Sequence, residues 1–230
     1  MRLHVHEWGT GDRTAVLVHG ITSDSGSWWQ VGPELAGLGY HVLAPHLRGH
    51  GHSPRGPYSL AAWADDLVES VPAEPDLAIG HSLGGLVIGA AVDRLRPHRV
   101  VYEDPAWTPP IGEREQRAAE FRAHADWTLD DIRAAYPRWD SGAHEAKLAA
   151  VKRWDPATTE FIVTDFDVFD PAPPTVPALL MLADPSTLVA PDRAAELEKM
   201  GFEVRVVPGA GHVIHNDDFA GFRTALDGWL

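Results

Sequence analysis

A serine at the centre of a Gly-x-Ser-x-Gly pentapeptide is the residue of this chain best suited to nucleophilic chemistry. Residues 80–84 read Gly-His-Ser-Leu-Gly; an apolar run, residues 77–79, precedes them and a helical pattern follows. This order predicts a strand, a sharp turn and a helix, with the hydroxyl of Ser82 at the apex of the turn. Gly80 and Gly84 fit such a turn because side chains there would collide with the neighbouring strand and helix.

A serine hydroxyl becomes a strong nucleophile only beside a base, and His212 is the predicted base. Residues 202–208 alternate in polarity and contain β-branched side chains, which predicts a strand. A loop, residues 209–212, follows this strand, and a final helix is expected over residues 216–230. His212 should therefore lie after the last strand, at the sheet edge where Ser82 also lies, in the chain order serine then histidine.

The carboxylate that would orient the imidazole has two candidates. Asp104 ends the predicted strand 99–104, immediately before a proline that stops the strand. Because the carboxyl ends of parallel strands meet at one edge of a sheet, Asp104 can reach His212. Asp184 follows the next strand along the chain and is the alternative acid. Glu103 ranks third, since strand alternation points it to the opposite face.

Two backbone N–H groups are expected to stabilise the oxyanion that forms when the serine attacks a carbonyl. One belongs to Leu83, because amides at the start of a helix have no partner within the helix. The other belongs to Ile21, in the loop that follows the predicted strand 14–19. His19 lies at the start of this loop, where we expect its ring to hold the loop rather than to transfer protons.

Strands and helices alternate along most of the chain, which predicts a mostly parallel sheet with helices on both faces. Predicted strands cover residues 3–8, 14–19, 41–45, 76–81, 99–104, 178–183 and 203–208, and predicted helices cover residues 28–38, 59–71, 83–95, 190–200 and 217–229.

These motifs together resemble the α/β-hydrolase fold family. The resemblance implies an α/β fold, a mostly parallel doubly wound sheet with an inserted helical cap, and hydrolysis of esters and related acyl compounds by serine, acid and histidine. The matching pieces are residues 19–20, 28, 35, 39–40, 42–45, 48–53, 80–84 and 209–212.

The chain departs from the family pattern at two places. His46 stands where the family often has aspartate before an Arg-Gly-His-Gly turn. The family's acid usually follows the penultimate strand, in a Gly-x-x-Asp-x-x-Val pattern. Matching Val189 to that valine puts Ser186 in the aspartate column and Asp184 two positions early. This mismatch is why the choice between Asp104 and Asp184 stays open.

A helical insert interrupts the alternation. We expect a core of residues 1–106 and 175–230, and a cap of residues 107–174 that prolines bracket on both sides. The predicted cap helices cover residues 113–125, 129–135 and 144–152, and the bracketing prolines are Pro105, Pro109, Pro110, Pro171, Pro173, Pro174 and Pro177.

The cap leaves the sheet after one strand and returns before the next, so it should lie over Ser82 and shape the substrate pocket. Trp107, Trp28 and His19 are the predicted pocket residues. For most other aromatic residues of the cap, packing between cap and sheet is the favoured interpretation.

Bulk properties narrow the function. The chain has 230 residues, a formal net charge of −14 and no cysteine. Strong negative charge argues against nucleic-acid binding, and the lack of cysteine excludes disulfides and thiolate catalysis. The N-terminal residues lack an apolar signal core and no run approaches membrane-spanning length, so we expect a cytoplasmic protein without a membrane partner.

We expect no cofactor and no metal. His46, His50 and His52 lie close in sequence, but no ordered ligand pattern with a carboxylate accompanies them, and their glycines indicate a turn. A carboxylate nucleophile, as epoxide or haloalkane hydrolysis would need, is absent at position 82.

The predicted function is a serine hydrolase that cleaves a small-molecule carboxylic ester through an acyl-enzyme intermediate. Lactone hydrolysis, carbon–carbon bond hydrolysis or cofactor-free perhydrolysis on the same residues is the first alternative. A ligand-binding protein on a hydrolase scaffold is the second, because fold does not fix function. The sequence assigns neither the substrate nor the oligomeric state.

Overall fold

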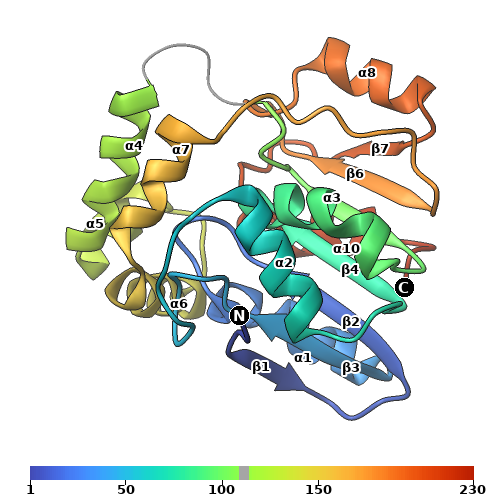
Figure 1. The fold of residues 1–230 in the computed structure, drawn as a ribbon, viewed down its shortest axis with the longest axis horizontal. Coiled ribbons are helices and arrows are strands. Elements are labelled where there is room, and N and C mark those ends of the chain that lie inside the picture. The colour runs from blue at the N-terminus through green and yellow to red at the C-terminus, as the bar shows by residue number, and fades with distance from the viewer. Residues whose placement is uncertain (109–113) are drawn as a thin grey trace.

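The centre of the fold is a seven-stranded sheet, seen in a computed structural model that describes residues 1–108 and 114–230 (Figure 1). The strand order is β1-β3-β2-β4-β5-β6-β7; β1 pairs with β3 antiparallel and the other neighbours pair in parallel. All seven predicted strands are confirmed. Their bounds are β1 (Val5–Trp8), β2 (Arg13–Val18), β3 (Tyr40–Pro45), β4 (Leu77–His81), β5 (Val100–Glu103), β6 (Ala178–Leu182) and β7 (Glu203–Val206).

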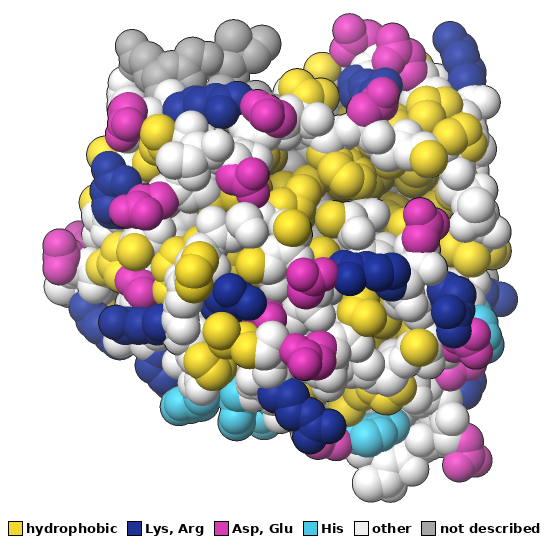
Figure 2. Space-filling model, in the orientation of Figure 1, with side chains coloured by type: hydrophobic (Ala, Val, Ile, Leu, Met, Phe, Trp, Pro, Cys, Tyr) yellow, Lys and Arg dark blue, Asp and Glu magenta, His cyan; other side chains and the backbone are white. Residues whose placement is uncertain are grey.

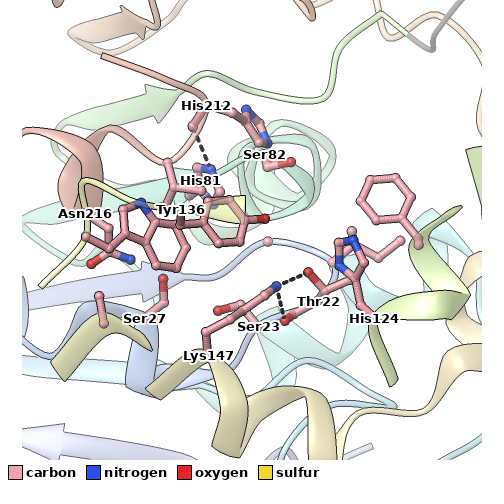
Figure 3. Close-up of a pocket in the computed structure, with 16 residues that line it drawn as sticks. Thr22, Ser23, Ser27, His81, Ser82, His124, Tyr136, Lys147, His212 and Asn216 are labelled. Atoms are coloured by element: carbon pink, nitrogen blue, oxygen red, sulfur yellow. Dashed lines mark hydrogen bonds between the residues drawn. The ribbon is translucent and has the colours of Figure 1, made fainter. Parts of the chain in front are cut away.

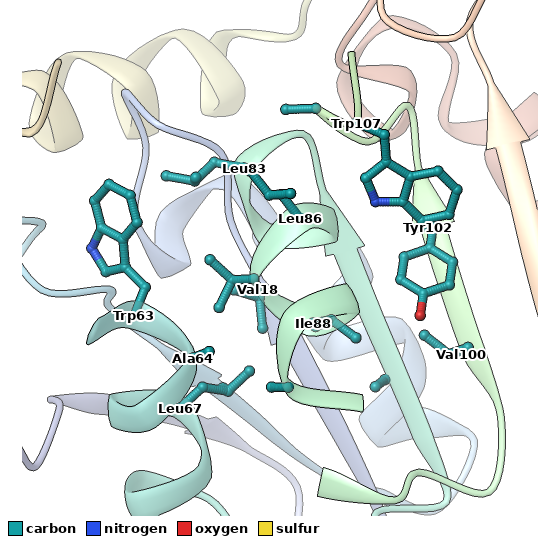
Figure 4. Close-up of a cluster of buried hydrophobic side chains, with 14 of the residues drawn as sticks. Val18, Trp63, Ala64, Leu67, Leu83, Leu86, Ile88, Val100, Tyr102 and Trp107 are labelled. Carbon is teal, nitrogen blue, oxygen red and sulfur yellow. The ribbon is translucent and has the colours of Figure 1, made fainter. Parts of the chain in front are cut away.

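Helices cover both faces of the sheet, which confirms the doubly wound architecture. Alternate residues of β2 point to opposite faces: Val16 and Val18 join one hydrophobic core, and Ala15 and Leu17 join the other. The first core includes α2, α3 and α8 and is shown in Figure 4; the second includes α1 and α10. The bounds are α1 (Val31–Gly37), α2 (Leu60–Ser70), α3 (Leu83–Leu95), α8 (Pro191–Lys199), α9 (Ile214–Asp217) and α10 (Phe219–Ala225).

The C-terminal segment differs from its prediction as one helix over residues 216–230. It forms two short helices, α9 and α10, which Asp218 separates with an extended backbone (φ −151°, ψ 83°). The side chain of Asp218 accepts a hydrogen bond from the backbone N–H of Gly221 (2.9 Å) and so begins a new helix. The helical periodicity across the break concealed this aspartate cap.

Between β5 and β6, the described residues form four α-helices that gather at one side of the sheet (Figure 1). Three of them fall where the sequence predicts helices, and the short α7 was not predicted. Pro109, Pro110 and the predicted helix start at Glu113 lie outside the described residues. The bounds are α4 (Arg114–Ala123), α5 (Leu129–Ala135), α6 (Ser141–Arg153) and α7 (Glu160–Thr164), and we refer to residues 114–164 as the insert.

The surface bears a mixture of charges. Figure 2 shows acidic and basic side chains interspersed over one face, with hydrophobic side chains gathered beside α8. Within residues 1–108 and 114–230, every helix is too short or too polar to cross a lipid bilayer.

Candidate active site

Ser82 sits on a strained turn between β4 and α3. Its backbone has φ 52° and ψ −115°, which costs a non-glycine residue about 1–3 kcal/mol unless neighbours enforce it. Three backbone hydrogen bonds do so. The N–H of Ser82 donates to the carbonyl of Glu103 (3.0 Å), and its own carbonyl accepts from Leu86 (3.2 Å) and Ala106 (3.0 Å). The turn is therefore fixed by the end of β5, by Ala106 just after that strand, and by α3, the helix that begins at the turn.

Close backbone contacts explain the glycines on either side of Ser82. A Cβ atom on Gly84 would lie 2.0 Å from the carbonyl oxygen of Val18, and one on Gly80 would lie 2.5 Å from the carbonyl oxygen of Gly84. The predicted need for glycine at both positions is confirmed, because no side chain fits at such distances.

His212 is hydrogen-bonded to Asp104. Its Nδ1–H donates to Asp104 Oδ2 over 2.6 Å, and Asp104 Oδ1 accepts from the backbone N–H of Ala183 (3.3 Å). Asp104 is 1% exposed, whereas the His212 side chain is 41% exposed. With Nδ1 bound to the carboxylate, Nε2 is the nitrogen free to accept a proton. Figure 3 shows the His212 ring beside Ser82.

Asp184, the alternative acid, makes no hydrogen bond with His212 in the described structure. It is exposed, and its Oδ2 accepts a hydrogen bond from the backbone N–H of Gly209 (3.2 Å). Ser186, in the family's aspartate column, accepts from the backbone N–H groups of Leu188 and Val189 and so holds a turn. Of the two candidate acids, Asp104 is therefore the one that reaches His212.

Ile21 and Leu83, the two predicted oxyanion donors, lie beside the same space as Ser82. Both residues line a cavity together with Ser82 and His212, and no described residue accepts a hydrogen bond from either N–H group. Two donors without a protein partner beside the serine are what an oxyanion requires.

Two buried histidines fix the loop that bears Ile21. His19 Nδ1 donates to the carbonyl of Gly20 (2.8 Å), and its Nε2 accepts from the N–H of Leu47 (3.0 Å). His50 Nε2 donates to the carbonyl of Ile21 (2.6 Å). Burial lowers the pKa of both rings, so both are neutral near pH 7.

The pocket prediction for Trp107, Trp28 and His19 is wrong, because all three are buried away from the cavities beside Ser82. Trp107 is 2% exposed and packs against Tyr102 with ring centres 4.8 Å apart (Figure 4). Trp28 stacks on His215 with ring centres 4.3 Å apart, and both Trp28 and His19 are fully buried. Large aromatic rings gain more from complete burial than from facing a polar cavity.

Two cavities of different character meet at Ser82. The first, the polar chamber, measures about 80 Å³ and is shown in Figure 3; its lining includes Thr22, Ser23, Ser27, Tyr136, Lys147 and Asn216. The second, the apolar chamber, measures about 290 Å³; its lining includes Phe121, Phe161, Ile162, Phe166 and Leu188. Ser82, His212 and Ile21 line both chambers. A bond held at Ser82 can therefore place one side of a substrate in each chamber.

A second hydrogen-bonded histidine lies behind the site, and sequence reasoning missed it. His215 donates from its backbone N–H (3.0 Å) and from Nδ1 (2.8 Å) to the buried carboxylate of Glu103. Its Nε2 accepts from the hydroxyl of Ser27 over 2.8 Å. Burial would raise the pKa of Glu103, but the His215 ring and these hydrogen bonds outweigh it and hold the pKa below its ordinary value. The Glu103-Asp104 doublet and the His212-x-x-His215 spacing were the available signals.

This network also ties the loop of His212 to the nucleophile turn. His81, the residue before Ser82, donates from Nε2 to the backbone carbonyl of His212 (3.0 Å). Its ring lies edge-on to that of His215, with centres 5.4 Å apart. The 212–215 segment is thus held at His212 and at His215.

The histidines considered as metal ligands serve local structure. His46 Nε2 bonds with the hydroxyl of Ser25 (2.7 Å), and its Nδ1 accepts from the N–H of His52 (2.9 Å). Across the part of the chain that the structure describes, no cluster of three or more histidine, aspartate or glutamate side chains is arranged to hold a metal ion.

Comparisons with known proteins identify the family and the fold. The model of a family described as "Alpha/beta hydrolase family" matches residues 15–225. The N-formylmaleamate deformylase of Pseudomonas putida is 29% identical over 260 aligned positions, which cover 100% of this chain and 93% of the relative.

Solved structures are similar over nearly the whole chain. A crystal structure of an N-formylmaleamic acid deformylase from Pseudomonas putida has a TM-score of 0.81 at 27% identity, over 97% of this chain and 95% of that one. An esterase from Exiguobacterium antarcticum has a TM-score of 0.78 at 16% identity, over 99% of this chain and 94% of that one. The second likeness concerns the fold alone.

The buried Glu103–His215 pair yields a stability prediction. Replacing Glu103 by glutamine removes a charge-assisted hydrogen bond and should lower the free energy of unfolding by about 1–3 kcal/mol in urea titrations at pH 7. Since the pKa of Glu103 is lowered in the folded state, its contribution exists above the ordinary value of 4.5 and is lost as the pH falls through the folded-state pKa. The difference in the free energy of unfolding between Glu103→Gln and the wild type should therefore shrink as the pH falls.

The matched control for this prediction is Glu74→Gln, because Glu74 pairs with Arg96 at the exposed surface. It should cost about 0.5 kcal/mol or less. Equal unfolding free energies for the two variants at pH 7 would contradict the assigned role of Glu103.

Proposed function

The chain belongs to the alpha/beta hydrolase family, and from this we propose that it is a serine hydrolase that cleaves a small-molecule carboxylic ester through Ser82, His212 and Asp104. The observation that most supports the proposal is the 2.6 Å hydrogen bond between His212 and the buried Asp104, beside the strained turn of Ser82. A carboxylate on Nδ1 keeps Nε2 available as a base and stabilises the imidazolium that forms.

In the proposed reaction, His212 removes the hydroxyl proton of Ser82 as the oxygen attacks the substrate carbonyl. The N–H groups of Leu83 and Ile21 stabilise the resulting oxyanion. The intermediate collapses to an acyl-enzyme, and His212 donates its proton to the departing alcohol. Water then attacks the acyl group with His212 as base, which releases the acid and restores Ser82.

The insert acts as the cap of this enzyme. Phe121 of α4 lines both chambers, and Phe161 of α7 and Lys147 of α6 each line one. We assign the core to residues 1–106 and 175–230 and the cap to residues 107–174. Side chains of the cap then decide which acyl and leaving groups fit beside the nucleophile.

Cleavage of an N-formyl amide is the second candidate. The similarity to a deformylase extends over 97% of the chain at 27% identity. If the substrate is an amide, this similarity favours an N-formyl amide over other amides. The same steps would release the parent amide, whose nitrogen takes a proton from His212, and water would then release formate from the formyl-enzyme. Parallel assays with esters, N-formyl amides, lactones, diketones and peroxide separate the reactions that these residues can perform.

Replacing the nucleophile tests the proposal directly. Ser82→Ala should lower kcat/KM for 4-nitrophenyl acetate by about 10⁴-fold or more, because no other group replaces the attacking oxygen. A fluorophosphonate should label the wild type at one site, and intact mass with peptide mapping should locate the label on Ser82.

Ser27→Ala is the matched control, since Ser27 also lies 2.8 Å from a histidine that bears a carboxylate. This variant should keep the label. Unchanged turnover in Ser82→Ala, or labelling of Ser27, would end the proposal. Slow or absent labelling of the wild type would favour a ligand-binding protein on a hydrolase scaffold.

The identity of the acid gives a separate test. Asp104→Asn should lower kcat by about 10³-fold or more, because an amide stabilises the imidazolium poorly and favours the wrong tautomer of His212. Asp184→Asn removes a surface carboxylate that bonds to Gly209, so kcat should stay within about 3-fold of wild type. The opposite ranking would assign the acid to Asp184.

A further inference from the structure

The polar chamber contains a buried lysine that the proposed reaction does not use. Lys147, on α6, is only 7% exposed and lines the chamber opposite Ser82 (Figure 3). Its ammonium group donates to the backbone carbonyl of Thr22 (2.8 Å) and to the hydroxyl of the same residue. An ammonium has three N–H groups, so one remains for a ligand in the chamber.

No carboxylate neutralises this ammonium group within the described residues. Asp24 is the acid whose charge acts on Lys147, but its carboxylate is bonded to Arg153 (2.6 Å) and to the N–H of Gly26 (2.8 Å). Burial lowers the pKa of Lys147 to about 7, and the charge of Asp24 only partly opposes the shift. A buried cation with hydroxyl and carbonyl partners alone is costly, and an added anion would relieve that cost.

The chamber also holds a polar nitrogen atom without a partner among the described residues. The Nδ1 atom of His124 is buried and makes no hydrogen bond with a described residue, and its ring lines the chamber. Burial, and then the charge of Lys147, lowers the pKa of His124 to about 4, so the ring is neutral at pH 7 and able to donate. Buried polar atoms of this kind usually have a partner in the functional complex.

The described side chains that line the two chambers include basic residues but no acidic ones. The chain has 33 acidic and 19 basic residues, yet the described lining of both chambers contains no aspartate or glutamate. The described lining of the polar chamber includes one lysine, Lys147, and that of the apolar chamber includes one arginine, Arg117. An anionic substrate is therefore favoured over a cationic one in this cavity.

We propose that the polar chamber binds a carboxylate of the substrate, with Lys147 as its counter-ion and the ring of His124 as a neighbouring hydrogen-bond donor. The enzyme then prefers acyl compounds that bear a carboxylate a few atoms from the scissile carbonyl. This inference rests on the proposed function of Ser82, because it names the substrate class of that site. The small volume of the chamber, about 80 Å³, suits a carboxylate on a short chain.

Lys147 also ties α6, through Thr22, to the loop that bears Ile21. A purely structural role of Lys147 must therefore be separated from ligand binding. Lys147→Gln keeps a donor for the Thr22 carbonyl and removes the charge. Lys152→Gln is the matched control, because it removes the same charge from an exposed position of the same helix.

The first experiment compares 4-nitrophenyl hemisuccinate with 4-nitrophenyl butyrate, which differ mainly in the terminal carboxylate. Lys147→Gln should lower kcat/KM for the hemisuccinate by about 10- to 100-fold and for the butyrate by less than about 3-fold. Lys152→Gln should change neither substrate by more than about 2-fold in about 0.15 M salt, where surface charges are screened. Equal losses for both substrates, or no loss, would overturn the proposal.

The second experiment does not depend on turnover. Succinate is titrated into Ser82→Ala by calorimetry, at pH 8 in buffers of different ionisation enthalpy. Binding should take up as much as about one proton, since an anion favours the charged lysine, and Lys147→Gln in the same background should abolish the uptake. Binding without Lys147-dependent proton uptake would reject the inference, whereas residual turnover in Ser82→Ala would reject the proposed function instead.

Wild-type enzyme supplies a test in case Lys147→Gln fails to fold. The ratio of kcat/KM for hemisuccinate to that for butyrate should fall between pH 6 and pH 9 as Lys147 loses its proton. The titratable and charged groups around Lys147 are Asp24, Arg153, His19, His124 and Tyr136, and across the chamber lie His81 and His212. His212 acts on both substrates in the proposed reaction, so its contribution cancels in the ratio. A ratio that stays constant with pH would overturn the proposal.

Discussion

The structure depends on two adjacent carboxylates at the end of β5. Glu103 points to one face of the sheet and holds His215, and Asp104 turns the other way and holds His212. Both carboxylates are almost fully buried, so each requires a hydrogen-bonded partner. One strand end thereby fixes a loop more than 100 positions further along the chain. The carbonyl of Glu103 also accepts the N–H of Ser82, so the same residue positions the nucleophile turn.

The buried and the exposed histidines of the site differ in what they can do. His19, His50 and His81 are buried, and burial lowers the pKa of each, so they act as neutral hydrogen-bonding groups that hold backbone carbonyls in place. The side chain of His212, by contrast, is 41% exposed at the edge of the cavity, where solvent and substrate can reach it. The proposed base can therefore exchange protons with its surroundings, whereas the buried rings serve as hydrogen-bonding groups.

The insert contributes polar as well as apolar groups to the space above the sheet. Lys147 links α6 to the loop of Ile21, and Trp63 of α2 packs edge-on against Phe161 of α7 with ring centres 5.0 Å apart. The first contact places charge next to the oxyanion loop, and the second buries apolar area between the core and the insert. The segment next to Ile21 is therefore bonded to the insert as well as to the core.

The sequence alone determined the strands, most helices and the glycine turn, and it named His212 as the candidate base and Asp104 as one of two candidate acids, because periodicity, turn chemistry and strand-end position are local properties of the chain. It left Asp184 as an alternative acid, placed Trp28, Trp107 and His19 in the pocket, and missed the buried contacts of His215 and Lys147. Those questions depend on contacts such as Glu103 with His215 and Lys147 with Thr22, which lie 112 and 125 positions apart. Which distant side chains meet, and which aromatic rings are buried rather than face a cavity, follows from packing the whole sheet and insert together. Only the tertiary structure decides that, because no local pattern encodes it.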